Sequence, residues 1–280
     1  MTALGIIAGG GDLPLAVAES ASAGGREVFV AALMGSADKA IERFPHAWVS
    51  MGEVGRTFAV LRDHGCADVL LAGQVGRPRF SDVKVDAKGA LALPKVLAAA
   101  RKGDDALLRA LVDLVSSGGF RVVGVAEAAP GLLAPKGPLG RISPDDGQLA
   151  DMRTAARVVQ AMGALDVGQA AVVCDNLTLA VEAAEGTDAM IARVGTLPEN
   201  IRGTPAKKRG VLVKARKPMQ DGKTDLPVIG VKTVNNAAAA GLSGIAVEAG
   251  AALVINRVGI IEAADKAGLF VFGFSPDDLK

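Results

Sequence analysis

The chain is poor in aromatic residues, cysteine and histidine, and each shortage excludes or disfavours a class of function. Aromatic residues make up 3% of the 280 residues, with no tyrosine and one tryptophan, so a stacking surface for single-stranded nucleic acid is not expected. Lys and Arg number 31 against 30 for Asp and Glu, which gives no electrostatic basis for binding nucleic acid. Two isolated cysteines and two histidines exclude a disulfide framework and disfavour a zinc site or a Ser-His-Asp triad.

Long apolar segments are also missing, although 50% of the residues are hydrophobic. No stretch of about 18 consecutive apolar residues occurs, so no transmembrane helix is predicted. The first residues, MTALGIIAGGG, lack the basic start and the long apolar stretch of a secretory signal. We therefore expect a cytoplasmic protein, with peripheral contact at a membrane surface left open.

Strand-like apolar segments alternate with segments of helical spacing in the first half of the chain. This alternation predicts an α/β fold with a parallel sheet covered on both faces. We expect residues 1–129 to form a Rossmann-like N-terminal domain. The predicted strands are 4–8, 26–33, 47–51, 67–75 and 121–128. The first predicted helix ends near residue 23, and further helical segments are predicted over 53–64 and 89–116.

A change of composition divides the chain after the first half. Residues 129–147 contain four prolines and four glycines, which is typical of a linker or a boundary loop. We interpret residues 130–147 as a linker and residues 148–280 as a second α/β domain. In that domain we expect helices at 148–162, 187–194 and 259–267, with strands at 169–176, 211–213, 228–229 and 269–274; Cys174 should be buried in its strand.

GGGDLP at residues 9–14 stands between the first predicted strand and the first predicted helix. Glycines let the backbone approach a ligand closely, and a helix N-terminus attracts an anion. A dinucleotide fingerprint requires a third glycine where Pro14 stands, and no acidic residue ends the second strand, so an NAD site is disfavoured. A tight strand-to-helix turn without a ligand remains an equal alternative.

Two further segments carry candidate binding residues. LAGQVGRPRF ends the fourth predicted strand, where doubly wound sheets bind ligands, and its Gln74, Arg77 and Arg79 are candidates; a solvated loop is the alternative. EGTD at residues 185–188 places Glu185 as a candidate ligand for a hard cation. Thr187 or Asp188 is expected to cap the following helix.

Residues 214–227, KARKPMQDGKTDLP, concentrate charge between two strand-like segments. GKT at 222–224 resembles part of a P-loop, but Lys217 stands where that motif needs glycine, and a strand follows instead of a helix. Ammonium groups neutralise phosphate, and carboxylates bind Mg²⁺ together with phosphate oxygens. A solvated hairpin is the alternative, but it does not explain why prolines flank charges of both signs. The segment carries Lys214, Lys217, Lys223, Asp221 and Asp225, with Pro218 and Pro227 stiffening it.

AGGGDLP, GQVGRP and KARKPMQDGKTDLPVIGVKTV, in this order, resemble the UDP-2,3-diacylglucosamine pyrophosphatases of lipid A biosynthesis. The similarity is to the metal-dependent type that is unrelated to calcineurin-like phosphoesterases, and it covers nearly the whole chain. The late motif of that family reads roughly KxxKPxQDxRxDLP, and Lys223 stands here where Arg is expected. The matching residues are Lys214, Lys217, Pro218, Gln220, Asp221, Asp225, Leu226 and Pro227.

The resemblance implies Mg²⁺-dependent hydrolysis of UDP-2,3-diacylglucosamine to UMP and 2,3-diacylglucosamine 1-phosphate (lipid X), in a homodimer that holds the acyl chains between two domains. From the resemblance together with the residue patterns above, we expect Asp225, Asp221, Lys214 and Lys217 to be catalytic and Asp225, Asp221 and Glu185 to bind metal. The substrate-binding residues expected are Gly9, Gly10, Gly11, Asp12, Leu13, Gln74, Arg77, Thr187, Asp188, Gln220, Lys223 and Thr233. The alternatives are a sugar-nucleotide-binding regulatory protein and a nicotinamide-dependent oxidoreductase.

Overall fold

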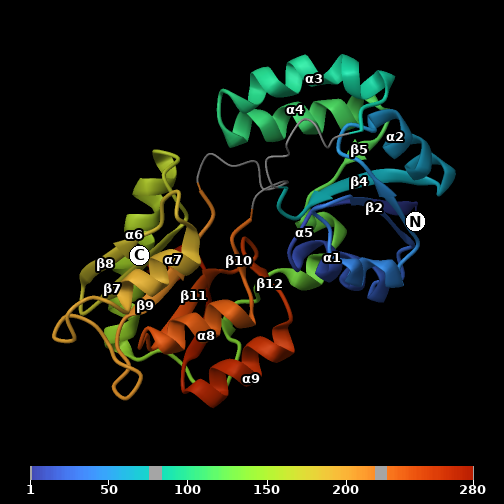
Figure 1. Cartoon of the computed structure of the whole chain (residues 1–280). Helices are drawn as coiled ribbons and strands as arrows, with labels where there is room; N and C mark the ends of the chain where they lie inside the picture. Colours follow the sequence, from blue (N-terminus) through green and yellow to red (C-terminus); the bar gives the residue numbers. More distant parts are fainter. Residues whose placement is uncertain (1, 76–83, 218–225, 280) are drawn as a thin grey trace. The chain divides into compact units, whose positions relative to one another are not determined.

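The computed structural model describes residues 2–75, 84–217 and 226–279 (Figure 1). The chain separates into two compact units, Met1–Gly131 and Leu132–Lys280. Each unit contains a sheet covered by helices, so the predicted mixed α/β class is confirmed.

The sheet of the first unit is parallel throughout, as predicted. Its strand order is β3-β2-β1-β4-β5, with Ile6 of β1 opposite both Val30 of β2 and Leu70 of β4. Because β1 lies between β2 and β4, the order of winding reverses there, and the carboxyl ends of β1 and β4 meet at the switch point of the sheet. The strands are β1 (Ala3–Ala8), β2 (Val28–Leu33), β3 (His46–Val49), β4 (Cys66–Ala72) and β5 (Arg121–Val122).

Helices cover both faces of this sheet. Phe58, Leu61 and Val115 pack on one face, against Phe29 and Val49 of the strands. On the other face α1 lies against β1 and β2 (Figure 1). The helices are α1 (Leu13–Ala23), α2 (Val54–Asp63), α3 (Ala87–Ala100), α4 (Asp104–Ser117) and the short α5 (Val125–Ala128); a 3₁₀ turn, η1, spans Lys39–Arg43.

The helical region predicted over 89–116 is confirmed, and it consists of two antiparallel helices, α3 and α4, because Gly103 adopts a positive φ of 110° that breaks the helix between them. Another sequence prediction for this unit was wrong. The strand predicted over 121–128 ends at Val122, and residues 125–128 form α5. Short apolar segments do not distinguish a buried strand from a buried helix, and Val123, Val125 and Ala128 are all buried here.

The second unit has a mixed sheet with the strand order β6-β13-β11-β9-β7-β8. β9, β11 and β13 are parallel to one another, whereas β7 is antiparallel to both of its neighbours. β10 (Val228–Ile229) and β12 (Leu253–Val254) form a separate parallel pair. The strands of the main sheet are β6 (Gly137–Pro138), β7 (Ala170–Cys174), β8 (Leu177–Val181), β9 (Val211–Lys214), β11 (Gly244–Glu248) and β13 (Phe270–Phe274).

Part of the Pro/Gly-rich segment belongs to the second unit. Ala134 N–H donates to the Ala252 carbonyl at 2.8 Å, and Leu139 N–H donates to the Val271 carbonyl at 2.8 Å. Residues 137–138 form the edge strand β6, which pairs with β13. The backbone of residues 134–139 is therefore hydrogen-bonded to strands and loops of the second unit.

Alternation along β9 decides which residues reach which face of the second sheet. Val211 and Val213 pack against Met152 and Val159 of α6, whereas Leu212 lies in the cluster made with α7, α8 and α9. Because strand side chains alternate, Lys214 shares the face of Leu212. The helices are α6 (Asp146–Ala164), α7 (Gly186–Val194), α8 (Val231–Ala239) and α9 (Arg257–Ala267).

Candidate functional site

The glycine turn of the first unit is joined to the end of β4. Gly9 N–H donates to the Ala72 carbonyl at 2.8 Å, and Gly10 and Gln74 exchange main-chain hydrogen bonds of 2.7 and 2.9 Å. The structure thus brings together the predicted residues Gly9, Gly10 and Gln74 at the switch point of the sheet.

Close backbone contacts explain two of the three glycines. A Cβ atom on Gly9 would lie 2.5 Å from the Gln74 carbonyl oxygen, and one on Gly10 would lie 2.8 Å from the Ser36 carbonyl oxygen. Gly11 differs, because it has a φ of 85° and, among the described residues, no heavy atom lies within 4 Å of its added Cβ. Gly11 is therefore the glycine whose α-carbon faces open space.

The next residues form the N-terminus of α1. Asp12 precedes the helix and is exposed, Leu13 is its first residue, and Pro14 follows. Within the described part of the chain, the Asp12 side chain makes no capping hydrogen bond. The first N–H groups of a helix carry partial positive charge, so this end of α1 favours an anion.

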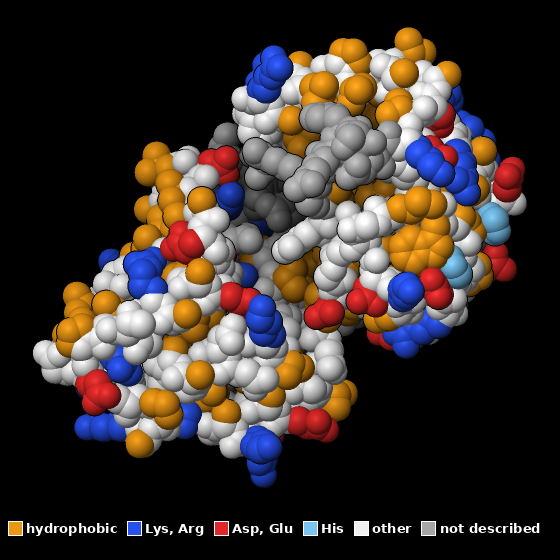
Figure 2. Space-filling view, viewed as in Figure 1, with side chains coloured by type: hydrophobic (Ala, Val, Ile, Leu, Met, Phe, Trp, Pro, Cys, Tyr) orange, Lys and Arg blue, Asp and Glu red, His pale blue; other side chains and the backbone are white. Residues whose placement is uncertain are grey.

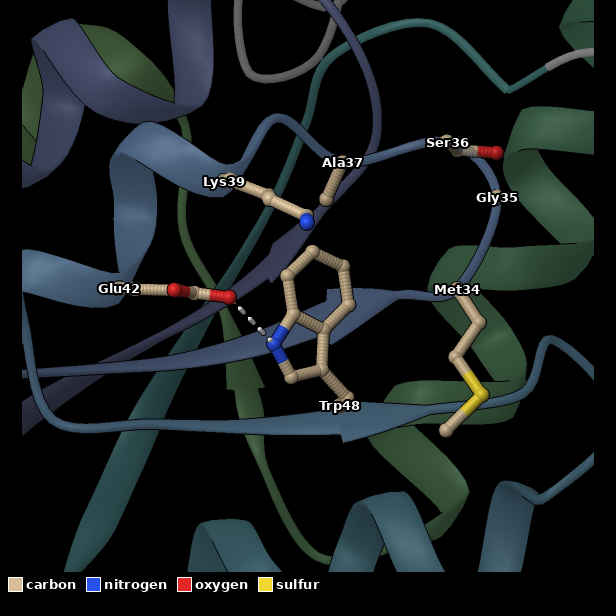
Figure 3. Close-up of a pocket in the computed structure, with 7 residues that line it drawn as sticks. All are labelled: Met34, Gly35, Ser36, Ala37, Lys39, Glu42 and Trp48. Atoms are coloured by element: carbon tan, nitrogen blue, oxygen red, sulfur yellow. Dashed lines mark hydrogen bonds between the residues drawn. The ribbon is translucent and has the colours of Figure 1, made fainter.

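A cavity of ≈ 510 Å³ lies beside the glycine turn, beyond the carboxyl end of β2. Figure 3 shows the indole of Trp48 between Lys39 and Ala37 on one side and Met34 on the other. The indole N–H donates to Glu42 Oε1 at 3.2 Å. Since the Ser36 carbonyl also approaches Gly10, the cavity and the glycine turn are neighbours. The lining residues are Met34, Gly35, Ser36, Ala37, Lys39, Glu42 and Trp48.

In the second unit, Lys214 is buried at the end of β9, with 5% of its surface exposed. Its ammonium donates to Thr187 Oγ1 at 2.9 Å and to the Val228 carbonyl at 3.1 Å. Removing an ammonium group from water is unfavourable unless the protein supplies acceptors and an opposite charge.

Thr187 does not cap α7, which corrects the sequence prediction. The helix begins at Gly186, after Glu185, and no side-chain capping bond is present there among the described residues. Instead, the Thr187 hydroxyl donates to Glu182 Oε1 at 2.5 Å and accepts from Lys214. Thr187 therefore connects a buried carboxylate to a buried ammonium.

The N-termini of α7 and α8 are joined by an ion pair. Lys232 Nζ lies 2.7 Å from Asp188 Oδ2, and Asn236 Nδ2 donates to Asp188 Oδ1 at 2.9 Å. The Asp188 carboxylate raises the pKa of Lys232. Thr233 Oγ1 accepts from Gly230 N–H at 3.3 Å and so caps α8. The helix starts thus lie on the Lys214 side of the sheet, where their N–H groups favour a phosphate.

Glu185 and Lys217 each have a partner of opposite charge. Glu185 Oε1 lies 3.1 Å from Arg193 Nη2. The pKa of Glu185 is lowered mainly by a main-chain hydrogen bond and, to a smaller extent, by the Arg193 guanidinium. Lys217 Nζ lies 2.7 Å from Asp166 Oδ1.

The remaining candidates lie outside the described residues: Arg77, Arg79, Gln220, Asp221, Lys223 and Asp225. Among the residues that are described, no group of three or more His, Cys, Asp or Glu side chains could hold a metal ion. The structure also adds a residue that no sequence pattern indicated, because Glu182 is only 7% exposed and contacts Thr187.

Comparison with known proteins identifies the family that the sequence resembled. The family model of the LpxI N-terminal domain matches residues 3–132, and that of the LpxI C-terminal domain matches residues 135–272. A protein of Caulobacter vibrioides named UDP-2,3-diacylglucosamine pyrophosphatase LpxI is 49% identical over 278 residues, which cover 99% of each chain. The predicted resemblance is confirmed at this level, and the chain belongs to the LpxI family.

Proposed function

We propose that this chain hydrolyses UDP-2,3-diacylglucosamine, with one water, to UMP and 2,3-diacylglucosamine 1-phosphate. The observation that carries the proposal is the 49% identity, over 99% of both chains, to a protein named for this pyrophosphatase activity. The buried Lys214 at two helix N-termini supports it independently, because such a site suits a phosphate group.

The second unit supplies the charge that phosphoryl transfer requires. Lys214 is held at the end of β9 by Thr187 and Val228, and Lys217 follows three residues later. We propose that these ammonium groups stabilise the negative charge that develops on the phosphate oxygens. Thr187, Asp188, Thr233, Gln220 and Lys223 complete the substrate contacts that we propose for this unit.

The first unit supplies a backbone surface for the other part of the substrate. Among the described residues no heavy atom lies within 4 Å of a Cβ added to Gly11, Asp12 precedes α1 and Leu13 begins it, so main-chain N–H groups there suit a phosphate. We propose that Gly9–Leu13, Gln74 and Arg77 contact the nucleotide.

We propose that Asp221 and Asp225 bind Mg²⁺, or that Asp225 orients the attacking water. Glu185 fits this role poorly, since its carboxylate pairs with Arg193. Bound Mg²⁺ would neutralise phosphate charge. Metal binding has its own readout: MgCl₂ should raise the melting temperature of the wild-type protein and leave that of Asp225→Asn unchanged.

The direct test is incubation of the purified chain with UDP-2,3-diacylglucosamine in ¹⁸O-water, followed by mass spectrometry of both products. We expect UMP and lipid X, with the label in one of them, which identifies the phosphorus attacked. Substrate binding without product would favour the regulatory protein. A change in absorbance at 340 nm with a nicotinamide cofactor, without UMP, would favour the oxidoreductase.

We also propose a cytoplasmic enzyme that contacts the anionic inner membrane through α3. Residues 87–103 contain Lys88, Lys95, Arg101 and Lys102 and no acidic residue, and Leu91 is 83% exposed. Figure 2 shows apolar side chains on the surface of the helical pair α3 and α4. Exposed apolar residues flanked by lysines are typical of helices that bind anionic lipid surfaces. The remaining exposed apolar residues of α3 are Ala87, Ala90, Pro94, Ala98 and Ala100.

No helix in the described residues is long and apolar enough to cross a membrane, so this contact would be peripheral. Leu91→Glu should reduce sedimentation with vesicles containing anionic lipid, whereas Val258→Glu, at a site 68% exposed in the second unit, should not. If Leu91→Glu instead converts a dimer to a monomer and leaves vesicle binding unchanged, a second copy covers α3. We propose the homodimer itself without assigning its surface.

A further inference from the structure

Four side or main chains of the second unit form a continuous hydrogen-bonded series. Gln169 N–H donates to Glu182 Oε2 at 3.3 Å, the Thr187 hydroxyl donates to Glu182 Oε1 at 2.5 Å, and Lys214 Nζ donates to Thr187 Oγ1 at 2.9 Å. Glu182 and Lys214 are both buried, with 7% and 5% of their surfaces exposed. A buried carboxylate and a buried ammonium are therefore linked through one half-buried hydroxyl.

The direction of the Thr187 hydroxyl follows from this arrangement. A hydroxyl has one proton to donate, whereas an ammonium has no lone pair. Lys214 must therefore donate to Thr187, and the one Thr187 proton points to Glu182. The hydrogen bond to the Glu182 carboxylate polarises the Thr187 hydroxyl, and it orients a lone pair of the Thr187 oxygen toward the Lys214 ammonium.

We propose that Glu182 is a positioning residue for Lys214 and acts through the Thr187 hydroxyl. The inference rests on the proposed function only insofar as Lys214 handles phosphate. Glu182 supplies an opposite charge close to the buried ammonium, and Thr187 transmits its effect. The Thr187 hydroxyl lies between the two groups, so its hydrogen bond to Glu182 fixes the oxygen to which Lys214 donates.

Acylation of lysines tests this without using enzyme activity. The full-length protein is treated briefly with acetic anhydride at pH 8, and acetylation at Lys214 is quantified by peptide mass spectrometry. Glu182→Gln and Thr187→Val should each raise Lys214 labelling about tenfold, because loss of an opposite charge and of its relay favours the neutral, mobile amine. Thr187→Ser keeps the hydroxyl and should label as the wild type does.

Two controls separate positioning from general loss of structure. Asp166→Asn removes the ion pair of Lys217 and should raise labelling at Lys217 and leave Lys214 unchanged. Cys174, buried in β7, should remain unreactive toward a thiol reagent in every variant. If Lys214 labelling stays at the wild-type level in folded Glu182→Gln, or if Cys174 becomes reactive together with Lys214, Glu182 has no specific positioning role.

Kinetics then connect the positioning to catalysis. With wild-type hydrolysis established, Glu182→Gln should lower kcat about tenfold or more while KM changes less than about threefold, the pattern expected when an interaction matters mainly in the transition state. An equal kcat in Glu182→Gln and wild type would overturn the catalytic part of the inference. If the wild type itself releases no UMP, the proposed function fails, but the labelling result still decides whether Glu182 positions Lys214.

Discussion

Gly10 and Gln74 exchange both of their main-chain hydrogen bonds, at 2.7 and 2.9 Å, where the ends of β1 and β4 meet. This pair fixes the glycine turn to the neighbouring strand end. The Gln74 carbonyl leaves no room for a side chain at Gly9, and the Ser36 carbonyl leaves none at Gly10. Substitution of Gly10 by valine would bring its Cβ into the Ser36 carbonyl, so that substitution cannot separate ligand binding from folding.

Alanine substitutions should distinguish the two kinds of glycine in this turn. Gly9→Ala should lower the free energy of unfolding by about 2–4 kcal/mol, because its Cβ would meet the Gln74 carbonyl. Gly11→Ala should lower it by only about 1–2 kcal/mol, the effect of a left-handed backbone conformation in an L-residue. Urea unfolding measures both; equal losses would show that the close contact at Gly9 relaxes.

Gly11→Ala also tests whether the turn contacts the substrate. The variant should fold and yet raise KM for UDP-2,3-diacylglucosamine several-fold, since the added methyl group occupies the open space in front of the turn. The matched control is Gly25→Ala, another position with positive φ (78°) and open surroundings among the described residues. A KM unchanged in both variants would restrict Gly11 to shaping the turn.

The glycine turn could be predicted because its signals are local. Three glycines between an apolar strand and a helix predict a tight turn, and parallel strands place their carboxyl ends at one edge. The sequence does not reveal whether a given glycine is needed for a close backbone contact, for a positive φ or for contact with a ligand. The contacts of Gly9 and Gly10 with Gln74 and Ser36 come from residues far away in the sequence.

Glu182 could not be predicted in the same way, because its role depends on a hairpin that was not recognised. Asp175 and Asn176 have φ values of 50° and 62°, and such a pair between apolar segments is a hairpin signal. Recognising β8 would have placed Glu182 on the face of the buried Ala180. Its contact with Thr187 still depends on how α7 packs, for which the sequence contains no local signal.

Asp225→Ala should reduce kcat about 100-fold or more and leave the fold intact. Loss of a metal ligand, or of the group that orients water, acts mainly on the transition state. The measurement is UMP release at saturating substrate, with circular dichroism to monitor folding. Asp113→Asn is the control, because Asp113 is exposed and pairs with Lys95 at 3.5 Å on α3 and α4; a normal kcat in folded Asp225→Ala would remove Asp225 from the mechanism.

Chelation should stop hydrolysis, and added Mg²⁺ should restore it. The sequence has two histidines and two cysteines, both cysteines are buried, and Asp221 and Asp225 offer oxygen ligands, which favours a hard cation. UMP release is measured after EDTA treatment and dialysis, then with Mg²⁺ or Ca²⁺ added back. Full activity in the dialysed protein would exclude a metal requirement.

Stability should fall with pH in the alkaline range because of Cys66. Burial raises the pKa of this thiol from 9.0 to about 11. Between these values the unfolded chain releases the thiol proton and the folded chain retains it, so the free energy of unfolding decreases as pH rises from about 9 to 11. With no tyrosine in the chain, phenols contribute nothing there. Urea unfolding of Cys66→Ala should show a shallower decrease; an identical slope would show that the thiol titrates normally.

Trp48 should report nucleotide binding at the first unit. It is the one tryptophan of the chain and lines the cavity together with Ser36 (Figure 3). The Ser36 carbonyl in turn approaches Gly10. Because its fluorescence depends on its surroundings, UMP bound at the glycine turn should change the emission in a saturable manner. Gly11→Ala should weaken the response, whereas Gly25→Ala should preserve it.

Trp48→Phe provides the decisive comparison for this prediction. The variant removes the fluorescent signal and the indole N–H bond to Glu42, so UMP affinity must then be measured by calorimetry. If the affinity falls several-fold, the nucleotide contacts the cavity itself, because phenylalanine lacks the larger ring surface and the N–H group of the indole. If the affinity is unchanged, Trp48 only senses binding at the neighbouring turn. No saturable emission change in the wild type at millimolar UMP would mean that the nucleotide does not bind at this edge of the sheet.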